Sequence, residues 1–170
     1  TNQSGEDIGR ALAISGDGTI LAASNAYANI DVGEVHVFEW VGGTWSQKGR
    51  TLQGQGEEIN FGLSVSLSQD GSILAVGIPD YGSLETTGFV RVFEFVDNDW
   101  VQIGQTLEGT SAGDGFGGDV SLSSDGRTLA VGADSYNGSS PDNSGSVQVY
   151  RFGSDGQWIQ PGSTLTGKSE

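Results

Sequence analysis

The sequence predicts an all-β protein built from three tandem four-stranded antiparallel sheets. Three observations support this fold class. A hairpin pattern with a Ser-Xaa-Asp-Gly or similar turn occurs three times, a strand of alternating Val and aromatic residues follows each hairpin, and a Trp opens a fourth strand. The copies keep the same order and recur about every 55 residues, so each one is expected to be a supersecondary unit that packs against the next.

The first two strands of each copy are expected to form a β-hairpin. In the second copy, residues 64–68 alternate small polar residues with Val and Leu, residues 69–71 supply the turn, and residues 73–76 return as an apolar strand. The three turns share one aspartate followed by glycine, at Asp17, Asp70 and Asp125. We expect these aspartates to accept hydrogen bonds from their own backbone while glycine takes a positive φ, which is a structural role.

The third and fourth strands complete each unit. Residues 34–40, 89–95 and 146–152 alternate Val and aromatic residues with polar ones, so one face of each strand is expected to be buried and the other wet. A turn of Gly, Asn and Asp follows, and a Trp then opens the fourth strand. The three tryptophans are expected to be structural anchors in the core between neighbouring sheets; they are Trp45, Trp100 and Trp158.

Four short antiparallel strands in about 55 residues are the content of one β-propeller blade. We therefore expect a single repeat domain over residues 1–170. Its blades span approximately 1–54, 55–109 and 110–167, and residues 168–170 start a further repeat. Three blades do not close a standard propeller, so a partial propeller or an open array is expected.

Composition narrows the classes of partner. The formal charge of −15 would repel nucleic acid and anionic membranes, and no apolar run is long enough to insert into a bilayer. The sequence has no cysteine, which leaves the redox compartment open. The glycosylation sequons at Asn137 and Asn2, with the acidic Gly/Ser/Thr-rich composition, favour an extracellular or cell-surface location.

The connection between the second and third strands differs in length between the copies. Variable loops on a repeated scaffold often share one face and carry recognition, although they can equally be tolerated surface loops. The candidate interaction residues near these loops are Tyr27, Asp80, Tyr81, Asp134, Tyr136 and Asp142.

Catalytic and metal-binding groups are sparse. His36 is the only histidine and occupies a strand position that Arg91 and Gln148 fill in the other copies, so it is expected to be a solvated strand residue. Each Asp-Gly turn keeps one carboxylate, whereas calcium takes six to eight oxygen ligands. We expect no cofactor and no enzymatic activity; the alternative is a calcium site formed by Asp134, Asp142 and Asn143.

The Phe61-Gly62 and Phe116-Gly117 pairs, with the Ala-Val-Gly segments at 75–77 and 130–132, resemble the FG-GAP repeat of integrin alpha-subunit propellers. The first copy is degraded at Ile8-Gly9. The resemblance covers nearly the whole chain and implies a β-propeller, usually of six or seven blades, that serves extracellular adhesion or assembly. Many such repeats carry a calcium loop with several Asp or Asn, and here those loops look emptied.

Two functions follow as hypotheses. The first is a non-catalytic extracellular structural or adhesion module whose propeller-like blades associate with copies of itself or with further blades of a longer chain, into a ring or a fibre. The alternative is a carbohydrate-binding or glycan-processing β-propeller that uses the variable loops. Its partners would be glycans or extracellular proteins.

Overall fold

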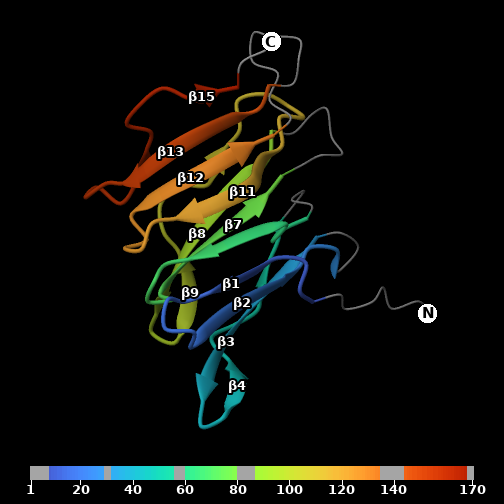
Figure 1. Ribbon diagram of the computed structural model, residues 1–170, viewed down its shortest axis with the longest axis vertical. Coiled ribbons are helices and arrows are strands. Elements are labelled where there is room, and N and C mark those ends of the chain that lie inside the picture. Colours follow the sequence, from blue (N-terminus) through green and yellow to red (C-terminus); the bar gives the residue numbers. More distant parts are fainter. Residues whose placement is uncertain (1–7, 29–31, 56–59, 80–86, 135–143, 168–170) are drawn as a thin grey trace, which may run out of the picture.

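The computed structural model describes residues 8–28, 32–55, 60–79, 87–134 and 144–167, and these residues form three antiparallel sheets (Figure 1). The first sheet contains β1 Leu12–Ile14, β2 Ile20–Asn25, β3 Glu34–Val41, β4 Thr44–Gln47 and β5 Leu52–Gln53. The second contains β6 Ser64–Leu67, β7 Ile73–Ile78, β8 Phe89–Val96, β9 Asp99–Gln102 and β10 Leu107–Glu108. The third contains β11 Phe116–Leu122, β12 Thr128–Ala133, β13 Ser146–Phe152, β14 Trp158–Ile159 and β15 Leu165–Thr166.

In each sheet the first three strands pair in chain order, and the expected fourth strand is divided into two pieces. In the first sheet both β4 and β5 pair with β3, and the other two sheets repeat this arrangement. The break contains Gly49 in the first sheet and Gly104 in the second, with φ of +74° and +70°. A positive φ turns the backbone out of the extended conformation, so the strand stops and restarts. The all-β fold with antiparallel sheets is therefore confirmed, and the sheets do not close into a barrel.

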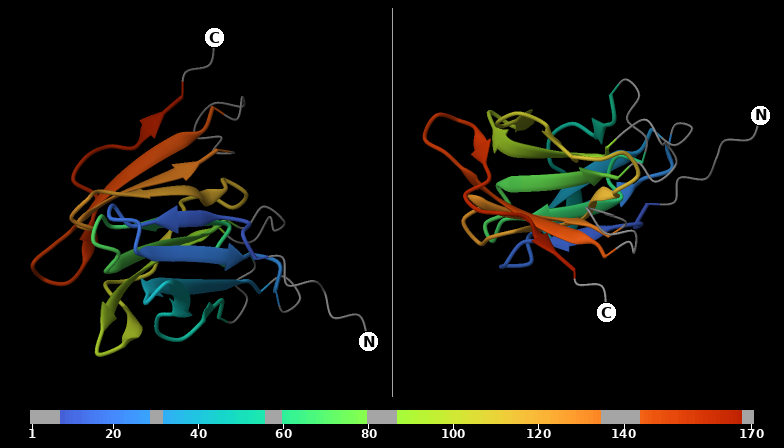
Figure 2. Two further views of the ribbon diagram at one scale, coloured as in Figure 1. Left: turned by 60° about the horizontal axis from the view of Figure 1, so that its bottom comes forward. Right: turned by 90° about the horizontal axis from the view of Figure 1, so that it is seen from above.

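The second sheet lies between the first and the third, as Figure 1 shows, and Figure 2 gives two further views of the same ribbon. The first strands β1, β6 and β11 contact one another in turn along the stack. One apolar core lies between sheets one and two, and a second core lies between sheets two and three. In each core, one face of a sheet packs against the opposite face of the sheet that follows it.

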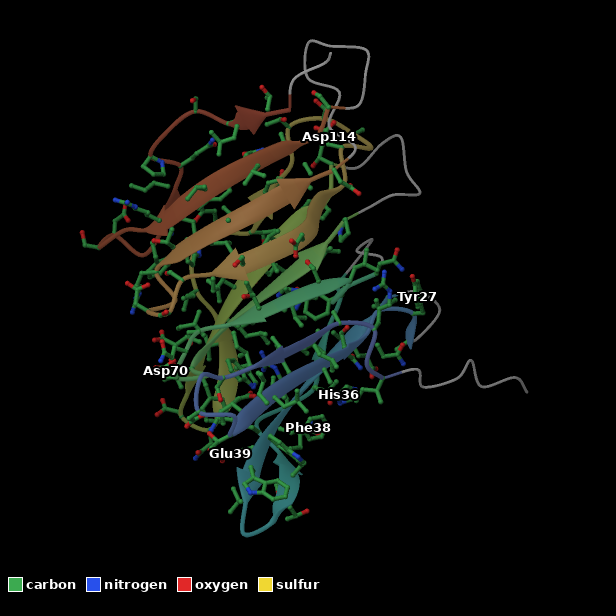
Figure 3. The ribbon with its side chains drawn as sticks, in the orientation of Figure 1. Tyr27, His36, Phe38, Glu39, Asp70 and Asp114 are labelled. Atoms are coloured by element: carbon green, nitrogen blue, oxygen red, sulfur yellow. The ribbon has the colours of Figure 1, made fainter. Side chains whose placement is uncertain are left out.

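The repeated positions match in register. Trp45 pairs with Trp40 across β3 and β4, and Trp100 pairs with Phe95 at the same place in the second sheet. Trp158 pairs with Phe152 in the third sheet. The Asp-Gly hairpin turns lie at one end of the strands, where Asp70 is labelled in Figure 3, and Tyr27 lies at the other end.

Candidate functional site

The junction between neighbouring sheets is built from contacts that occur twice in the chain. The indole Nε1 of Trp100 donates to the carbonyl of Lys48 at 2.9 Å, and Nε1 of Trp158 donates to the carbonyl of Ile103 at 3.3 Å. A Cβ added at Gly49 would meet Trp100 Cδ1 at 2.9 Å, and a Cβ added at Gly104 would meet Trp158 Cδ1 at 2.6 Å. Glycine is therefore required at each of these breaks for two reasons: the positive φ, and the close approach of the indole of the next sheet.

Residue type can change in a junction while the contact is kept. The guanidinium of Arg50 donates to the carbonyl of Trp100 at 3.0 Å and pairs with Asp99 at 3.2 Å. In the next junction the amide of Gln105 donates to the carbonyl of Trp158 at 2.7 Å. Both side chains hold the outer strand of the following sheet, so the junction geometry is conserved between copies that differ in sequence.

The phenylalanine of each Phe-Gly pair makes a second contact between neighbouring sheets. Phe61 and Phe116 are fully buried. A Cβ at Gly33 would clash with the carbonyl oxygen of Phe61, and a Cβ at Gly88 would clash with that of Phe116. Each phenylalanine thus sits in a slot of the preceding sheet that only glycine leaves open.

The hairpin turns form a third contact. The amide N–H of Gly16 donates to the carbonyl of Gln69 at 2.7 Å, and the amide N–H of Gln69 donates to the carbonyl of Ser124 at 3.0 Å. One backbone hydrogen bond therefore joins each turn to the turn of the next sheet.

The turn aspartates are held by local hydrogen bonds. Asp70 Oδ1 accepts from Ser68 Oγ at 2.6 Å and from the amide of Ser72 at 3.0 Å, and these bonds lower the pKa of Asp70. Hydrogen bonds from the serine two residues earlier likewise lower the pKa of Asp17 and of Asp125. Each carboxylate is used inside its own turn, as expected.

The first sheet has a face with no sheet packed on it. Trp45 on this face is 39% exposed, whereas the equivalent Trp100 and Trp158 are 0% and 3% exposed. The expected anchor role of Trp45 is therefore corrected: it is not a core residue here, because no preceding sheet covers it. The apolar side chains of this surface, called the head face below, are Ile8, Leu12, Ile14, Trp40 and Trp45.

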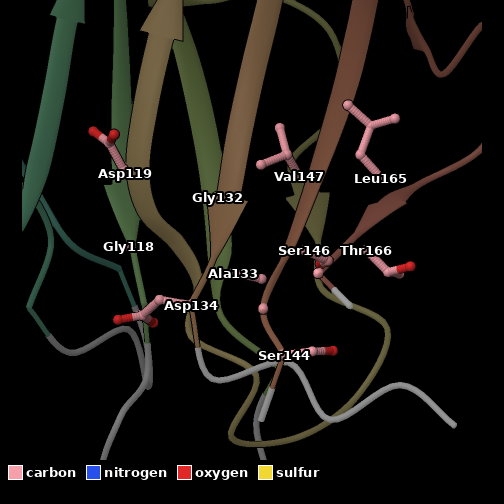
Figure 4. Close-up of a pocket in the computed structure, with 12 residues that line it drawn as sticks. Gly118, Asp119, Gly132, Ala133, Asp134, Ser144, Ser146, Val147, Leu165 and Thr166 are labelled. Carbon is pink, nitrogen blue, oxygen red and sulfur yellow. The ribbon is translucent and has the colours of Figure 1, made fainter. Parts of the chain in front are cut away.

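The third sheet has the opposite open face. Leu165 is 62% exposed, although the equivalent Leu52 and Leu107 are only 3% and 4% exposed. A groove of about 520 Å³ lies beside it (Figure 4). We call this surface the tail face; the residues used below are Asp119, Asp134, Gly145, Val147 and Leu165.

The sequence-predicted loop residues fall in different places. Tyr27 is exposed, so it could stack on a sugar ring, and Asp134 lines the groove of the tail face. The glycan-binding alternative stays a prediction, because most of its residues lie outside the described part of the chain. The residues outside it are Asn2, Asp80, Tyr81, Asn137, Tyr136 and Asp142.

Both ring nitrogens of His36 lie close to polar side chains of the first sheet. Its Nε2 lies 3.3 Å from Glu34 Oε2, and its Nδ1 lies 3.2 Å from Thr51 Oγ1. Within the described ranges, no group of three or more His, Cys, Asp or Glu side chains could hold a metal ion. Among these residues, no helical segment has the length and apolar character that crossing a bilayer requires.

The tail face contains residues that the sequence did not single out, including Asp119, Val147 and Leu165. The available signal was positional: Asp119 stands where the second copy has Ser64, because both pair with a glycine of the second strand. Only the burial of the equivalent residues in the inner junctions reveals which face of the third sheet is left uncovered.

Comparison with known proteins identifies the fold. No family model and no curated protein matches the chain, so the FG-GAP resemblance stays a prediction. Two solved structures of proposed 6-phosphogluconolactonases are similar: the one from Bacteroides fragilis has a TM-score of 0.62 and 17% identity over 92% of this chain and 38% of that chain. The one from Bacteroides uniformis has a TM-score of 0.61 and 17% identity over 93% and 40%.

Hydrazine synthase from Kuenenia stuttgartiensis is also similar, with a TM-score of 0.57 and 17% identity over 92% of this chain and 36% of that chain. The 6-phosphogluconolactonase neighbours have β-propeller-like folds. The present chain spans about two fifths of the length of the structures it matches.

These comparisons correct one prediction. The chain was expected not to be an enzyme, and that expectation is wrong, because neighbours with this fold are named as enzymes. The lack of a recognisable catalytic cluster in the sequence was therefore a poor argument. At 17% identity the similarity shows the fold alone, so it does not assign a substrate to this chain.

Proposed function

We propose that this chain is a run of three β-propeller-type blades in an extracellular structural or adhesion module, which associates with further blades through its head and tail faces. The single observation that carries the proposal is the contrast in burial between equivalent positions. Trp100 and Leu107 are buried in the inner junctions, whereas Trp45 and Leu165 are exposed at the two ends. Contiguous exposed apolar surface of this kind is typical of interaction sites.

The apolar burial available at the two faces is comparable to the cost of association. Full burial of a large, fully exposed apolar side chain contributes about 1.5–3 kcal/mol, whereas bringing two proteins together costs about 4–15 kcal/mol. The five apolar side chains of the head face, with Val147 and Leu165 of the tail face, are 39–62% exposed, so their burial would contribute about 5–11 kcal/mol. An exposed apolar residue at the outer rim of a sheet does not by itself indicate an uncovered face, because Val101 of the middle sheet is also exposed.

Charge opposes association. Each chain carries a formal charge of −15, so two copies repel one another at low ionic strength. At about 0.15 M salt the screening length is about 8 Å, and this repulsion is largely removed between distant surface charges. Contacts between the faces themselves are shorter in range and persist.

The extracellular part of the proposal rests on composition and on the FG-GAP resemblance. It is tested by the mass of the natural secreted material before and after glycosidase treatment. We expect a loss of mass that maps to Asn137, with Asn2 as a second candidate. An unchanged mass would remove the main argument for secretion.

The association is tested with the 170-residue chain by sedimentation velocity from micromolar to millimolar concentration in about 0.15 M salt. We expect the average mass to rise with concentration. The variants Trp45→Ser and Leu165→Ser should each weaken association, whereas Val101→Ser, at an exposed rim position, should leave it unchanged. A parent chain that remains monomeric over the whole range would overturn the proposal.

A further inference from the structure

The groove of the tail face corresponds to a slot that is filled in both inner junctions. Gly33 and Gly88 closely face the carbonyl oxygens of Phe61 and Phe116 of the following sheets. The equivalent Gly145 meets only Asp134 and Ala133 of its own sheet, at 3.5 Å or more. Among the described residues, nothing fills the slot beside Gly145, and in the repeat its occupant is the residue at the Phe-Gly position.

The tail face also differs from the inner junctions in charge. Between sheets two and three, Ser64 Oγ donates to the carbonyl of Gly117 at 2.8 Å. Asp119 takes the place of this serine in the third sheet, and it is exposed in the groove (Figure 4). An ionised carboxylate cannot donate a hydrogen bond to a carbonyl, so the tail face needs a partner that offers a donor or a positive charge.

The head face supplies such a group. The residue after the Phe-Gly glycine is Leu63 in the second copy and Gly118 in the third copy, but it is Arg10 in the first. Arg10 is exposed and no described residue pairs with its side chain. Of the three copies, only the one with the open head face carries a cation next to the position that would face Asp119.

The tryptophan contact is complementary too. The break in the fourth strand of the third sheet contains Pro161 and Gly162, which correspond to Lys48 and Gly49 of the first sheet. No described residue lies within 4 Å of a Cβ at Gly162, so this surface is open to an indole, although Gly162 does not have the positive φ of Gly49. Trp45 is the indole without a preceding sheet.

We infer that the occupant of the tail face is the head face of a second copy of this chain. Ile8 of the copy enters the groove beside Gly145, and its Arg10 pairs with Asp119. Trp45 of the copy packs on Gly162, with its Nε1 donating to the carbonyl of Pro161. This inference rests on the proposed function and names its partner and its register.

The test exchanges the two charges. Arg10→Asp places two aspartates opposite each other when such chains meet, and Asp119→Arg places two arginines opposite each other. Each variant alone should associate at least tenfold more weakly than the parent in sedimentation velocity. An equimolar mixture should recover most of the lost affinity, because each kind of chain then meets an opposite charge at both faces.

Asp155→Arg is the matched control for Asp119→Arg, since it makes the same change in net charge at an exposed turn outside both faces. It should associate at least as well as the parent. If the parent associates but the mixture does not recover affinity, the register is wrong while the proposed function stands. If the parent does not associate at all, both are wrong.

Discussion

At the scale of single residues, the hydrogen-bonded Ser-Xaa-Asp-Gly turn has the clearest consequences. Ser68 Oγ donates to Asp70 Oδ1 at 2.6 Å and accepts from the buried amide of Ile73 at 3.0 Å. The same pair of bonds is made by Ser15 and by Ser123 in the other turns. One hydroxyl thus satisfies a backbone donor that would otherwise be buried without a partner.

We expect Ser68→Ala to lower the free energy of unfolding by about 1–3 kcal/mol at pH 7, because the amide of Ile73 loses its acceptor. The pKa of Asp70 should rise toward its ordinary value in an NMR titration, since the bond from Ser68 is the main cause of its lowering. Urea unfolding measures the stability. Ser154→Ala, in an exposed turn, is the control and should change it by less than about 0.5 kcal/mol.

The sign of the pH dependence follows from the lowered pKa. Ionised Asp70 stabilises the fold, and this contribution is complete above the ordinary aspartate pKa of about 3.9 and is lost as the pH falls through the lowered value. The difference in stability between the parent and Ser68→Ala should therefore shrink in strong acid. A difference that grew on acidification would contradict this account.

Removal of calcium should not change the melting temperature. Asp17, Asp70 and Asp125 are the only carboxylates of their turns, and Oδ1 of each already accepts two or three hydrogen bonds. Calcium takes six to eight oxygen ligands, which these turns do not supply. Melting temperatures with and without a chelator should agree, and a loss of several degrees on chelation would reveal a site elsewhere in the chain.

At the scale of strands, the break in the fourth strand is the element that links one sheet to the next. The sequence predicted a single fourth strand, because Trp, Thr and Leu recur at fixed spacing. The glycine between them has a positive φ in the first two sheets, and the indole of the next sheet packs directly on it. Periodicity finds strands well, but it does not reveal that a tertiary contact divides one of them.

We predict that alanine lowers the stability at one glycine of the fourth-strand break and has little effect at the corresponding glycine of the third sheet. Gly104→Ala should cost more than about 1–2 kcal/mol, because φ is +70° and the new Cβ would meet Trp158 at 2.6 Å. Gly162→Ala should change the stability of the dilute monomer by less than about 0.5 kcal/mol, because its Cβ meets nothing. Urea unfolding at low concentration separates the two, and equal losses would mean that neither the positive φ nor the contact with the next indole sets the cost of alanine.

The same contrast explains which side chains the sequence predicted well. The three tryptophans are equivalent in spacing and in register, so a common buried role was a reasonable expectation for Trp45. Its burial depends on the sheet that precedes it, which is not a local property of the strand. For the same reason the exposure of Leu165 could not be predicted, since Leu52 and Leu107 share its pattern and are buried.

At the scale of the whole molecule, the stack has two chemically different ends. The head face presents two of the four tryptophans, Trp40 and Trp45, which are 46% and 39% exposed, while the other two are buried. Any partner that covers the head face therefore changes the solvent exposure of two of the four indoles. The sequence repeat predicted the three successive sheets. It did not predict which side chains are exposed at the two ends, because that depends on how the sheets pack.

Tryptophan fluorescence should report this coverage. As the concentration of the chain rises, we expect emission to shift to the blue and quenching by acrylamide to fall, because Trp40 and Trp45 leave water. The variant Trp40→Phe/Trp45→Phe keeps only the buried Trp100 and Trp158. Its quenching should be low and independent of concentration. A parent whose quenching does not change while its mass increases would place the contact on another surface.

The hydrogen bonds between hairpin turns also make one amide a reporter for the end of the stack. The N–H of Gly16 and the N–H of Gln69 each donate to the next turn, whereas the N–H of Ser124 finds no acceptor among the described residues. Ser124 should therefore exchange its amide proton with solvent deuterium much faster than Gln69 in the dilute chain. When a further sheet follows the third, its turn offers a carbonyl to Ser124, and the exchange of this one proton slows to the rate of its inner counterpart.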